Sequence, residues 1–580
     1  MQGTQSTDQS TSHDEGAQQA PAALVLSRRR LAQLGGTGLA VALLSACGGT
    51  TSAPTGTTAA ASTQPASGGS QATTTTTAIT AASPSASPQA SSTQATQAGQ
   101  PVRGGTLVYA RNLDAKTLDP HFSAQFSERF ALYCIYNTIV AYDKNFNLVP
   151  DLAAKWEVAS DGSSVTFTLQ PNVKFHDGTA CDATAVKWNI DRILNPATNS
   201  PLAGQINVID QTTAPDATTV MLHFKQPNRP LLASLGERPG FVVSPAAVQK
   251  YGKDFGANPV GSGPFKFVEW VADSHVTMAR FDGYWDTGKP YLDQIEIRHV
   301  ADPQVQSTMV RTGEAQVIDA VPATLVSVLK QASGVVVSEL QSGRFWGTQC
   351  HADKPPFNDV NLRMALVYGT DRDEVRTVVF GGTGRVATHP LGSGWAYDSS
   401  LDSQFPNYDL AKAKDYLAKA NVAGQTFTLT VTNTQPDQTL AQVLQAQYQK
   451  LGLTVKIATV DAAQSFAMVK AGTINWTSTD WAPRADPDGL LRILWYSKGF
   501  QNTTGANIAG LDTLLDKAAA EYDTSKAAPM YHQAEQLIVN NADYVFMHWP
   551  SLFAAMQSSV QNFIYYPDLI LRLRDLWLKK

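Results

Sequence analysis

Cysteine is scarce in this chain, with only 4 among 580 residues and no Cys-x-x-C spacing. Apart from Cys47, the thiols are Cys134, Cys181 and Cys350. A chain of this length can bury a hydrophobic core without disulfide bonds. We therefore expect three small buried side chains, with a Cys134–Cys181 disulfide as the alternative in an oxidising compartment.

Catalytic motifs are also lacking. The sequence has no Gly-x-Ser-x-Gly elbow, His-Glu-x-x-His pair, Walker loop or dinucleotide glycine fingerprint. The glycines at 381–384 lack the Lys-Ser/Thr of a phosphate loop, which predicts a turn, and His176 has no suitably spaced third metal ligand. We expect no cofactor, no metal and no enzyme activity; an exported enzyme is the alternative.

Residues 48–102 contain no charged and no aromatic residue. Such Thr/Ser/Ala/Gln-rich sequence cannot bury enough apolar surface to offset its conformational entropy, so we expect a disordered tether over 47–102. A flexible coil of this length reaches roughly 40 Å. Serine, threonine and proline richness also allows O-glycosylation.

The 46 residues before Cys47 have the organisation of an export signal. Ser-Arg-Arg-Arg-Leu at 27–31 precedes an apolar run that ends in Leu-Ser-Ala-Cys at 44–47. The arginines indicate a twin-arginine signal peptide over 1–46, with general export as the alternative. The final four residues resemble a bacterial lipobox, which would make Cys47 the lipidated N-terminus of the mature protein. Each buried acyl CH₂ contributes about 0.8 kcal/mol, so two or three chains anchor a protein lastingly.

The remaining body, 103–580, carries the whole net charge of −5, because the first 102 residues contain three charges of each sign. A mildly acidic body argues against a nucleic-acid partner. Its length predicts two or more lobes.

Strands and helices alternate along this body. Asp161-Gly162 predicts a hairpin turn between strands at 155–158 and 165–169. Further strands are expected at 220–224 and 295–297, and a strand–helix–strand unit at 427–431, 439–451 and 453–457. Asp409 should cap a helix, and 530–541 has helical periodicity. The fold class is therefore α/β, with a hairpin-rich first half.

A series of short motifs occurs in one fixed order over the whole body: Gly-Gly-Thr-Leu at 104–107, Thr-Leu-Asp-Pro-His at 117–121, Leu-Val-Pro-Asp-Leu-Ala at 148–153, Phe-His-Asp-Gly-Thr at 175–179, Asn-Pro-Val-Gly-Ser-Gly-Pro-Phe at 258–265, Tyr-Trp at 284–285, Pro-Pro-Phe-Asn-Asp-Val-Asn-Leu-Arg-Met-Ala-Leu at 355–366, Asp-Arg at 371–372 and Leu-Gly-Leu at 451–453. In this order the motifs resemble the extracellular solute-binding proteins of ABC importers, in the branch (family 5) with dipeptide-, oligopeptide- and nickel-binding members.

The resemblance implies a two-lobed periplasmic-binding-protein fold of type II. Lobe I would combine 103–137, 244–305 and 544–580, an extra subdomain would occupy 138–243, and lobe II would span 306–543. The two crossings between the lobes would form a hinge. A ligand that touches both lobes would favour closure. The loaded protein, expected to be a monomer outside the cytoplasm, would then dock on a permease driven by ATPase subunits.

Peptide-binding relatives imply where the ligand lies. In lobe I, the wall after the Leu-Asp-Pro-His motif would include Phe122, Ala124, Gln125 and Phe126, unless the two phenylalanines only pack the next helix. In lobe II, the strand at 476–480 would place Thr477, Ser478 and Asp480 in the cleft, with Asp480 pairing with a peptide α-ammonium group.

Other residues leave the ligand open. The segment between Asp480 and the Asp-Pro-Asp motif at 486–488 is longer than in the peptide-binding pattern. It contains Trp481, which could stack on a ring or cation, and Arg484, which could bind a carboxylate or simply pair with Asp486 or Asp488. The resemblance adds Trp346, Gln349 and Trp395 as cleft residues, although buried aromatics are common in cores. A di- or oligopeptide is favoured; a metal chelate, opine, sugar or alkaloid is the alternative.

Overall fold

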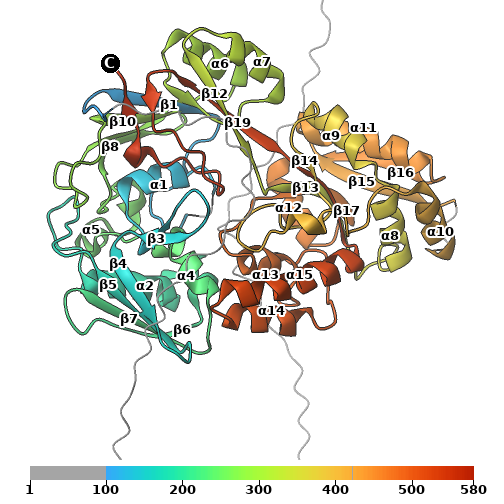
Figure 1. Cartoon of the computed structure of the whole chain (residues 1–580), viewed down its shortest axis with the longest axis horizontal. Helices are drawn as coiled ribbons and strands as arrows, with labels where there is room; N and C mark the ends of the chain where they lie inside the picture. The colour runs from blue at the N-terminus through green and yellow to red at the C-terminus, as the bar shows by residue number, and fades with distance from the viewer. Residues whose placement is uncertain (1–99, 124, 421, 423) are drawn as a thin grey trace, which may run out of the picture. The chain divides into compact units, whose positions relative to one another are not determined.

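The computed structural model describes residues 100–580 except 124, 421 and 423 (Figure 1). The predicted signal peptide, the predicted lipidation site Cys47, most of the predicted tether and Ala124 lie outside the described residues. Within the described part, no helix combines the length and apolar character needed to cross a membrane.

Lobe I is built on a seven-stranded sheet in the order β12-β19-β11-β1-β10-β9-β8. Its strands are β1 (Thr106–Arg111), β8 (Phe265–Val271), β9 (His275–Arg280), β10 (Gln294–His299), β11 (Val317–Ile318), β12 (Val335–Gln341) and β19 (Ser551–Gln557). The helices of this lobe are α1 (Arg129–Ile135), α5 (Pro245–Tyr251), α6 (Pro303–Thr312) and α7 (Ala323–Gln331).

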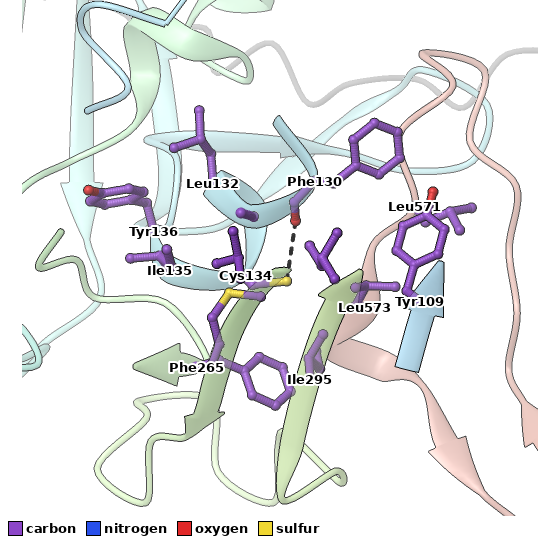
Figure 2. Close-up of a cluster of buried hydrophobic side chains, with 14 of the residues drawn as sticks. Tyr109, Phe130, Leu132, Cys134, Ile135, Tyr136, Phe265, Ile295, Leu571 and Leu573 are labelled. Carbon is purple, nitrogen blue, oxygen red and sulfur yellow. Dashed lines mark hydrogen bonds between the residues drawn. The ribbon is translucent and has the colours of Figure 1, made fainter. Parts of the chain in front are cut away.

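The core of lobe I lies between α1 and the sheet (Figure 2). Cys134 on α1 is buried there, and its thiol donates a 3.3 Å hydrogen bond to the Phe130 carbonyl. Cys134, Cys181 and Cys350 are all buried and free. This confirms the expectation of three small core side chains; the alternative Cys134–Cys181 disulfide is not formed.

The extra subdomain contains a four-stranded antiparallel sheet in the order β4-β5-β7-β6. Its elements are β4 (Ala153–Val158), β5 (Ser164–Leu169), β6 (Ile209–Thr213), β7 (Thr219–Phe224), α2 (Ala183–Leu194), α3 (Ala203–Ile206) and α4 (Pro230–Ser234). The short pair β2 (Val140–Tyr142) and β3 (Leu148–Pro150) precedes it. The predicted hairpin is β4–β5, and Gly162 in its turn has φ 70°.

Lobe II contains a six-stranded sheet in the order β14-β18-β13-β17-β15-β16. Its strands are β13 (Phe345–Cys350), β14 (Arg385–Val386), β15 (Thr426–Thr432), β16 (Thr454–Val460), β17 (Trp476–Trp481) and β18 (Tyr544–Trp549). Its helices are α8 (Val360–Gly369), α9 (Arg372–Phe380), α10 (Leu410–Ala420), α11 (Gln435–Gln449), α12 (Ala462–Lys470), α13 (Asp488–Trp495), α14 (Leu511–Ala520) and α15 (Thr524–Asn541).

Side chains alternate across this sheet, so each strand serves two helical layers. Cys350 joins the core beneath α8 and α11, whereas Phe345 joins the core beneath α13, α14 and α15. The predicted strand–helix–strand unit is β15, α11 and β16, with the two strands parallel. Asp409 accepts a hydrogen bond from the Lys412 amide at the start of α10, which confirms the predicted cap. The glycines at 381–384 form the predicted turn after α9.

The two large sheets divide the chain at residues other than 306 and 544, the boundaries of lobe II that the resemblance implied. Residues 306–341 contribute α6, β11, α7 and β12, whose strands pair in the lobe I sheet. Strand β18 pairs with β13 in the lobe II sheet. We propose that the lobes divide at the crossings between β12 and β13 and between β18 and β19.

Candidate ligand-binding site

The two crossings between the sheets run side by side. The last pair of the β12–β19 ladder is Gln341 with Ser551, and the chain then passes into β13 and out of β18. Ser342, which is buried, donates from its hydroxyl (2.7 Å) and its amide (3.3 Å) to the Pro550 carbonyl. Gly343 follows without room for a side chain, because a Cβ there would lie 2.1 Å from the Ser393 hydroxyl. The crossings therefore form one narrow, hydrogen-bonded ribbon.

Arg344 and Asp480 form an ion pair immediately after this ribbon. Arg344 Nε donates to Asp480 Oδ2 at 2.6 Å, and the guanidinium carbon lies 5.7 Å from the Trp346 ring centre. Their side chains are 32% and 34% exposed. The predicted ammonium-binding carboxylate thus already has a cationic partner, and both charges are accessible.

Arg229 joins the subdomain to lobe II. Only 6% exposed, it forms an ion pair with Asp486, donates to the Tyr531 hydroxyl (2.9 Å) and the Glu521 carbonyl (2.9 Å), and lies 4.6 Å from the centre of the Trp395 ring. Burial lowers the pKa of Arg229. A buried guanidinium requires hydrogen-bond acceptors. Because the acceptors of Arg229 belong to lobe II, these contacts exist only while the subdomain and lobe II are together.

Arg484 also reaches across to the subdomain. Its guanidinium lies 3.4 Å from a carboxylate oxygen of Glu237. The alternative in which Arg484 pairs with Asp486 or Asp488 is wrong, because Asp486 binds Arg229 and Asp488 binds Arg492 on its own helix. Both predicted alternatives were local, whereas the observed partner is 247 residues distant.

Trp395 and Arg484 share a small cavity in lobe II. This cavity measures about 10 Å³, roughly the space of one water molecule, and is also lined by Gly343, Ser393 and Pro483. A larger, open depression of about 470 Å³ lies between α2 and β6 of the subdomain and is lined by none of the predicted ligand-contacting residues.

The lobe I wall is only partly exposed. Gln125 is exposed, and its carbonyl accepts a 3.1 Å hydrogen bond from Arg238 Nη2. Phe126 packs edge-to-face on Phe130 at 5.4 Å, as the core-packing alternative expects. Phe122 is 41% exposed, and the guanidinium carbon of Arg192 lies 5.5 Å from the centre of the Phe122 ring.

The other predicted residues lie within the lobe II sheet. Gln349, Thr477 and Ser478 are buried, and Gln349 donates to the Thr503 hydroxyl at 3.1 Å. Trp346 donates from its indole nitrogen to Asp437 at 3.2 Å. Trp481 packs against the core beneath α13 to α15. Their contact with a ligand stays a prediction.

The structure therefore gathers Gln125, Trp395 and Arg484 around subdomain residues that the sequence did not single out, namely Arg229, Glu237 and Arg238. The available signal was the occurrence of charged residues inside the otherwise apolar stretch 229–243. Among the described residues, no three His, Cys, Asp or Glu side chains are arranged to hold a metal ion.

Comparison with known proteins shows what this architecture belongs to. Residues 147–502 match the family model described as bacterial extracellular solute-binding proteins, family 5 Middle. The chain belongs to this family. The glutathione-binding protein GsiB of Pectobacterium atrosepticum is 30% identical over 472 residues, which cover 79% of this chain and 91% of GsiB. GsiB of Escherichia coli (strain K12) is 29% identical over 475 residues, covering 80% and 92%.

Solved structures of family 5 proteins share the fold. The periplasmic binding protein DppA of Helicobacter pylori, in complex with the peptide STSA, aligns with TM-score 0.74 and 25% identity over 83% of this chain and 99% of DppA. AgaA of A. tumefaciens R10, in complex with agropinic acid, aligns with TM-score 0.72 and 25% identity over 82% and 99%. These relatives are binding proteins and not enzymes.

The chain is thus a two-lobed α/β solute-binding protein of family 5 that acts outside the cytoplasm. Proteins of this family bind small ligands and work with the permease and ATPase subunits of an ABC importer. The expected fold and class are confirmed.

Proposed function

We propose that this protein captures a di- or oligopeptide between its lobes and delivers it to an ABC permease while anchored to the membrane through Cys47. The observation that carries the choice of a peptide is the Arg344–Asp480 pair. It presents one positive and one negative group, both one-third exposed, beside the ribbon between the lobes. A peptide carries the complementary ammonium and carboxylate groups, which charge-assisted hydrogen bonds would recognise.

The relatives support the same ligand class. GsiB proteins are named for glutathione, a modified tripeptide, and DppA holds the peptide STSA. AgaA holds agropinic acid, so an opine is the ligand class to distinguish experimentally.

Closure couples binding to transport in this proposal. Arg229 and Arg484 contact Asp486 and Glu237 only when the subdomain and lobe II are together. A ligand that contacts both sides adds its own interaction energy to the closed form and shifts the population toward it. The permease would then recognise and bind the closed form.

Mass spectrometry of the material released by denaturing purified protein tests the ligand. We expect peptides, and a peptide found in this way should raise the melting temperature of the emptied protein and reduce its radius of gyration in X-ray scattering. Recovery of an opine or a metal chelate alone, with no response to a di- to pentapeptide library, would refute the peptide assignment.

The anchor has a separate test. In cells grown with labelled fatty acid, the wild-type protein should incorporate label and sediment with membranes. A Cys47→Ser variant should lose both properties, and unchanged labelling of this variant would remove Cys47 as the lipidation site.

A further inference from the structure

Arg238 lies in the subdomain beside the exposed lobe I residue Gln125, and it is short of acceptors. Its Nη2 donates to the Gln125 carbonyl at 3.1 Å, but its buried Nε has no hydrogen-bond partner among the described residues. Glu128, the adjacent carboxylate, instead accepts from the Ser123 hydroxyl (2.5 Å) and the Gln125 amide (3.0 Å). No described carboxylate lies within 4.0 Å of the Arg238 guanidinium. A cationic group in this state lacks its counter-ion.

The neighbouring carboxylates are already engaged. Glu237 lies 3.7 Å from Arg129 and 3.4 Å from Arg484. Asp568 lies 3.3 Å from Arg129 and 2.6 Å from Arg572. Two carboxylates thus serve three guanidinium groups, and Arg238 with Glu128 adds one charge of each sign, which leaves three carboxylates against four guanidinium groups. The local surplus is positive.

This surplus affects Arg238 itself. Burial, followed by the charge of Arg129, lowers the pKa of Arg238 to about 10; Arg484 acts in the same direction, whereas Glu237 and Glu128 act against it without restoring the usual value. Arg484 belongs to lobe II and Arg238 to the subdomain, so their mutual repulsion opposes closure. An anion between them would turn this repulsion into attraction.

A solvated guanidinium is the simpler explanation for many surface arginines. Arg238 differs because the side chain is only partly exposed and its Nε is enclosed without an acceptor. Leaving such a donor unpaired costs free energy, and a carboxylate bound by the exposed part of the same guanidinium would offset that cost.

We propose that Arg238 and Arg484 bind a carboxylate of the ligand that is additional to its α-carboxylate, so that the protein prefers acidic peptides. This inference rests on the proposed peptide-binding function and specifies its substrate class. A planar guanidinium matches a carboxylate with two parallel hydrogen bonds, and one guanidinium from each side of the interface would let the same carboxylate favour closure. Glutathione, for which the GsiB relatives are named, carries two carboxylates.

Calorimetry with paired peptides tests the preference. Di- to pentapeptides that differ only by Glu or Gln, such as Ala-Glu-Ala and Ala-Gln-Ala, are titrated into the full-length protein. A charge-assisted contact predicts that the Glu peptide binds roughly 10- to 100-fold more tightly. Arg238→Gln and Arg484→Gln should each reduce this ratio to within about 3-fold, because each removes one of the two cations.

Arg280→Gln is the matched control. Arg280 lies in lobe I and pairs with Asp282 (2.8 Å) and Asp293 (2.7 Å), so its loss changes the net charge equally without touching the site. The control should keep the wild-type ratio. A ratio that falls as much in the control would show a general field effect and overturn the inference.

The remaining outcomes separate the two proposals. Equal binding of Glu and Gln peptides by the wild type would leave the peptide function standing and refute the acidic preference. A preference that survives in both arginine variants would also refute it. Binding of no peptide would overturn the function and the inference together. Retained binding of the Gln peptide, with an unchanged circular dichroism spectrum, shows that a variant is folded.

Discussion

Replacement of Arg229 should weaken ligand binding through closure and not through contact with the ligand. The Arg229→Met substitution keeps an unbranched apolar stem of similar length to the aliphatic part of arginine but removes the charge and all donors. It leaves Asp486 without its cation, and the Tyr531 hydroxyl and Glu521 carbonyl without their partner. All of these acceptors belong to lobe II.

The size of the effect follows from burial. Removing one partner of a buried ion pair costs about 3 to 5 kcal/mol, because the remaining charge stays desolvated. In an open form, Arg229 and Asp486 would each face water, so the cost falls on the closed form alone. A loss of about 3 kcal/mol corresponds to a roughly 150-fold change in the closure equilibrium. The apparent Kd should rise by up to this factor.

Calorimetry with the bound peptide gives Kd, and X-ray scattering gives the fraction of closed molecules. Arg298→Gln serves as control, because Arg298 pairs with Glu296 (2.7 Å) and Glu314 (2.9 Å) inside lobe I. The double variant Arg229→Met/Asp486→Leu should recover much of the lost affinity, since it removes both charges. An unchanged Kd and scattering profile in Arg229→Met, or no recovery in the double variant, would refute the reasoning.

Three further predictions concern single groups. Asp480→Ala should abolish peptide-induced thermal stabilisation, yet shift the ligand-free melting temperature by only about 2 °C, because the ion pair is one-third exposed; full stabilisation would remove Asp480 from the site. Although burial lowers the pKa of His389, its hydrogen bonds to Asp402 (2.9 Å) and Glu535 (2.7 Å) outweigh this and raise it. The stability it contributes should therefore be complete below about pH 6.5 and disappear as the pH rises through the raised pKa. Denaturant titrations from pH 6 to 8.5 should show this decline in the wild type and not in His389→Gln; equal slopes would contradict it. In a Cys47→Ser variant, no thiol should react with Ellman's reagent at pH 8 until the protein unfolds, since burial raises all three thiol pKa values, that of Cys134 to about 12; a reaction in the native state would show that the cores open.

Local elements were predictable because their signals are local. Asp161-Gly162 predicted the β4–β5 turn, and the strand–helix–strand periodicity predicted β15, α11 and β16. The boundaries between the lobes were harder to predict from the sequence. Strand β12 follows lobe I helices directly in sequence, but its membership depends on pairing with β19, more than 200 residues later. No periodicity within 306–341 carries that information.

The site was predictable only as single residues. Gln125 and Trp395 came from the resemblance, and Arg484 came from the segment that departs from the peptide-binding pattern. The structure brings all three near the subdomain. Their charged neighbours Arg229 and Arg238 stand out in the sequence only as charges within an apolar stretch. Their partners could not be predicted, because a buried polar contact is defined by two segments. The same limit applies to Asp480, whose partner Arg344 lies 136 residues earlier.

The ribbon of the two crossings restricts how the protein can move. Bending within the plane of the two chains would stretch one relative to the other and shear the Ser342–Pro550 hydrogen bonds. Bending out of that plane changes neither chain length nor this bond. The two lobes should consequently rotate about a single axis. The angle of that rotation would suffice to distinguish an empty molecule from a filled one.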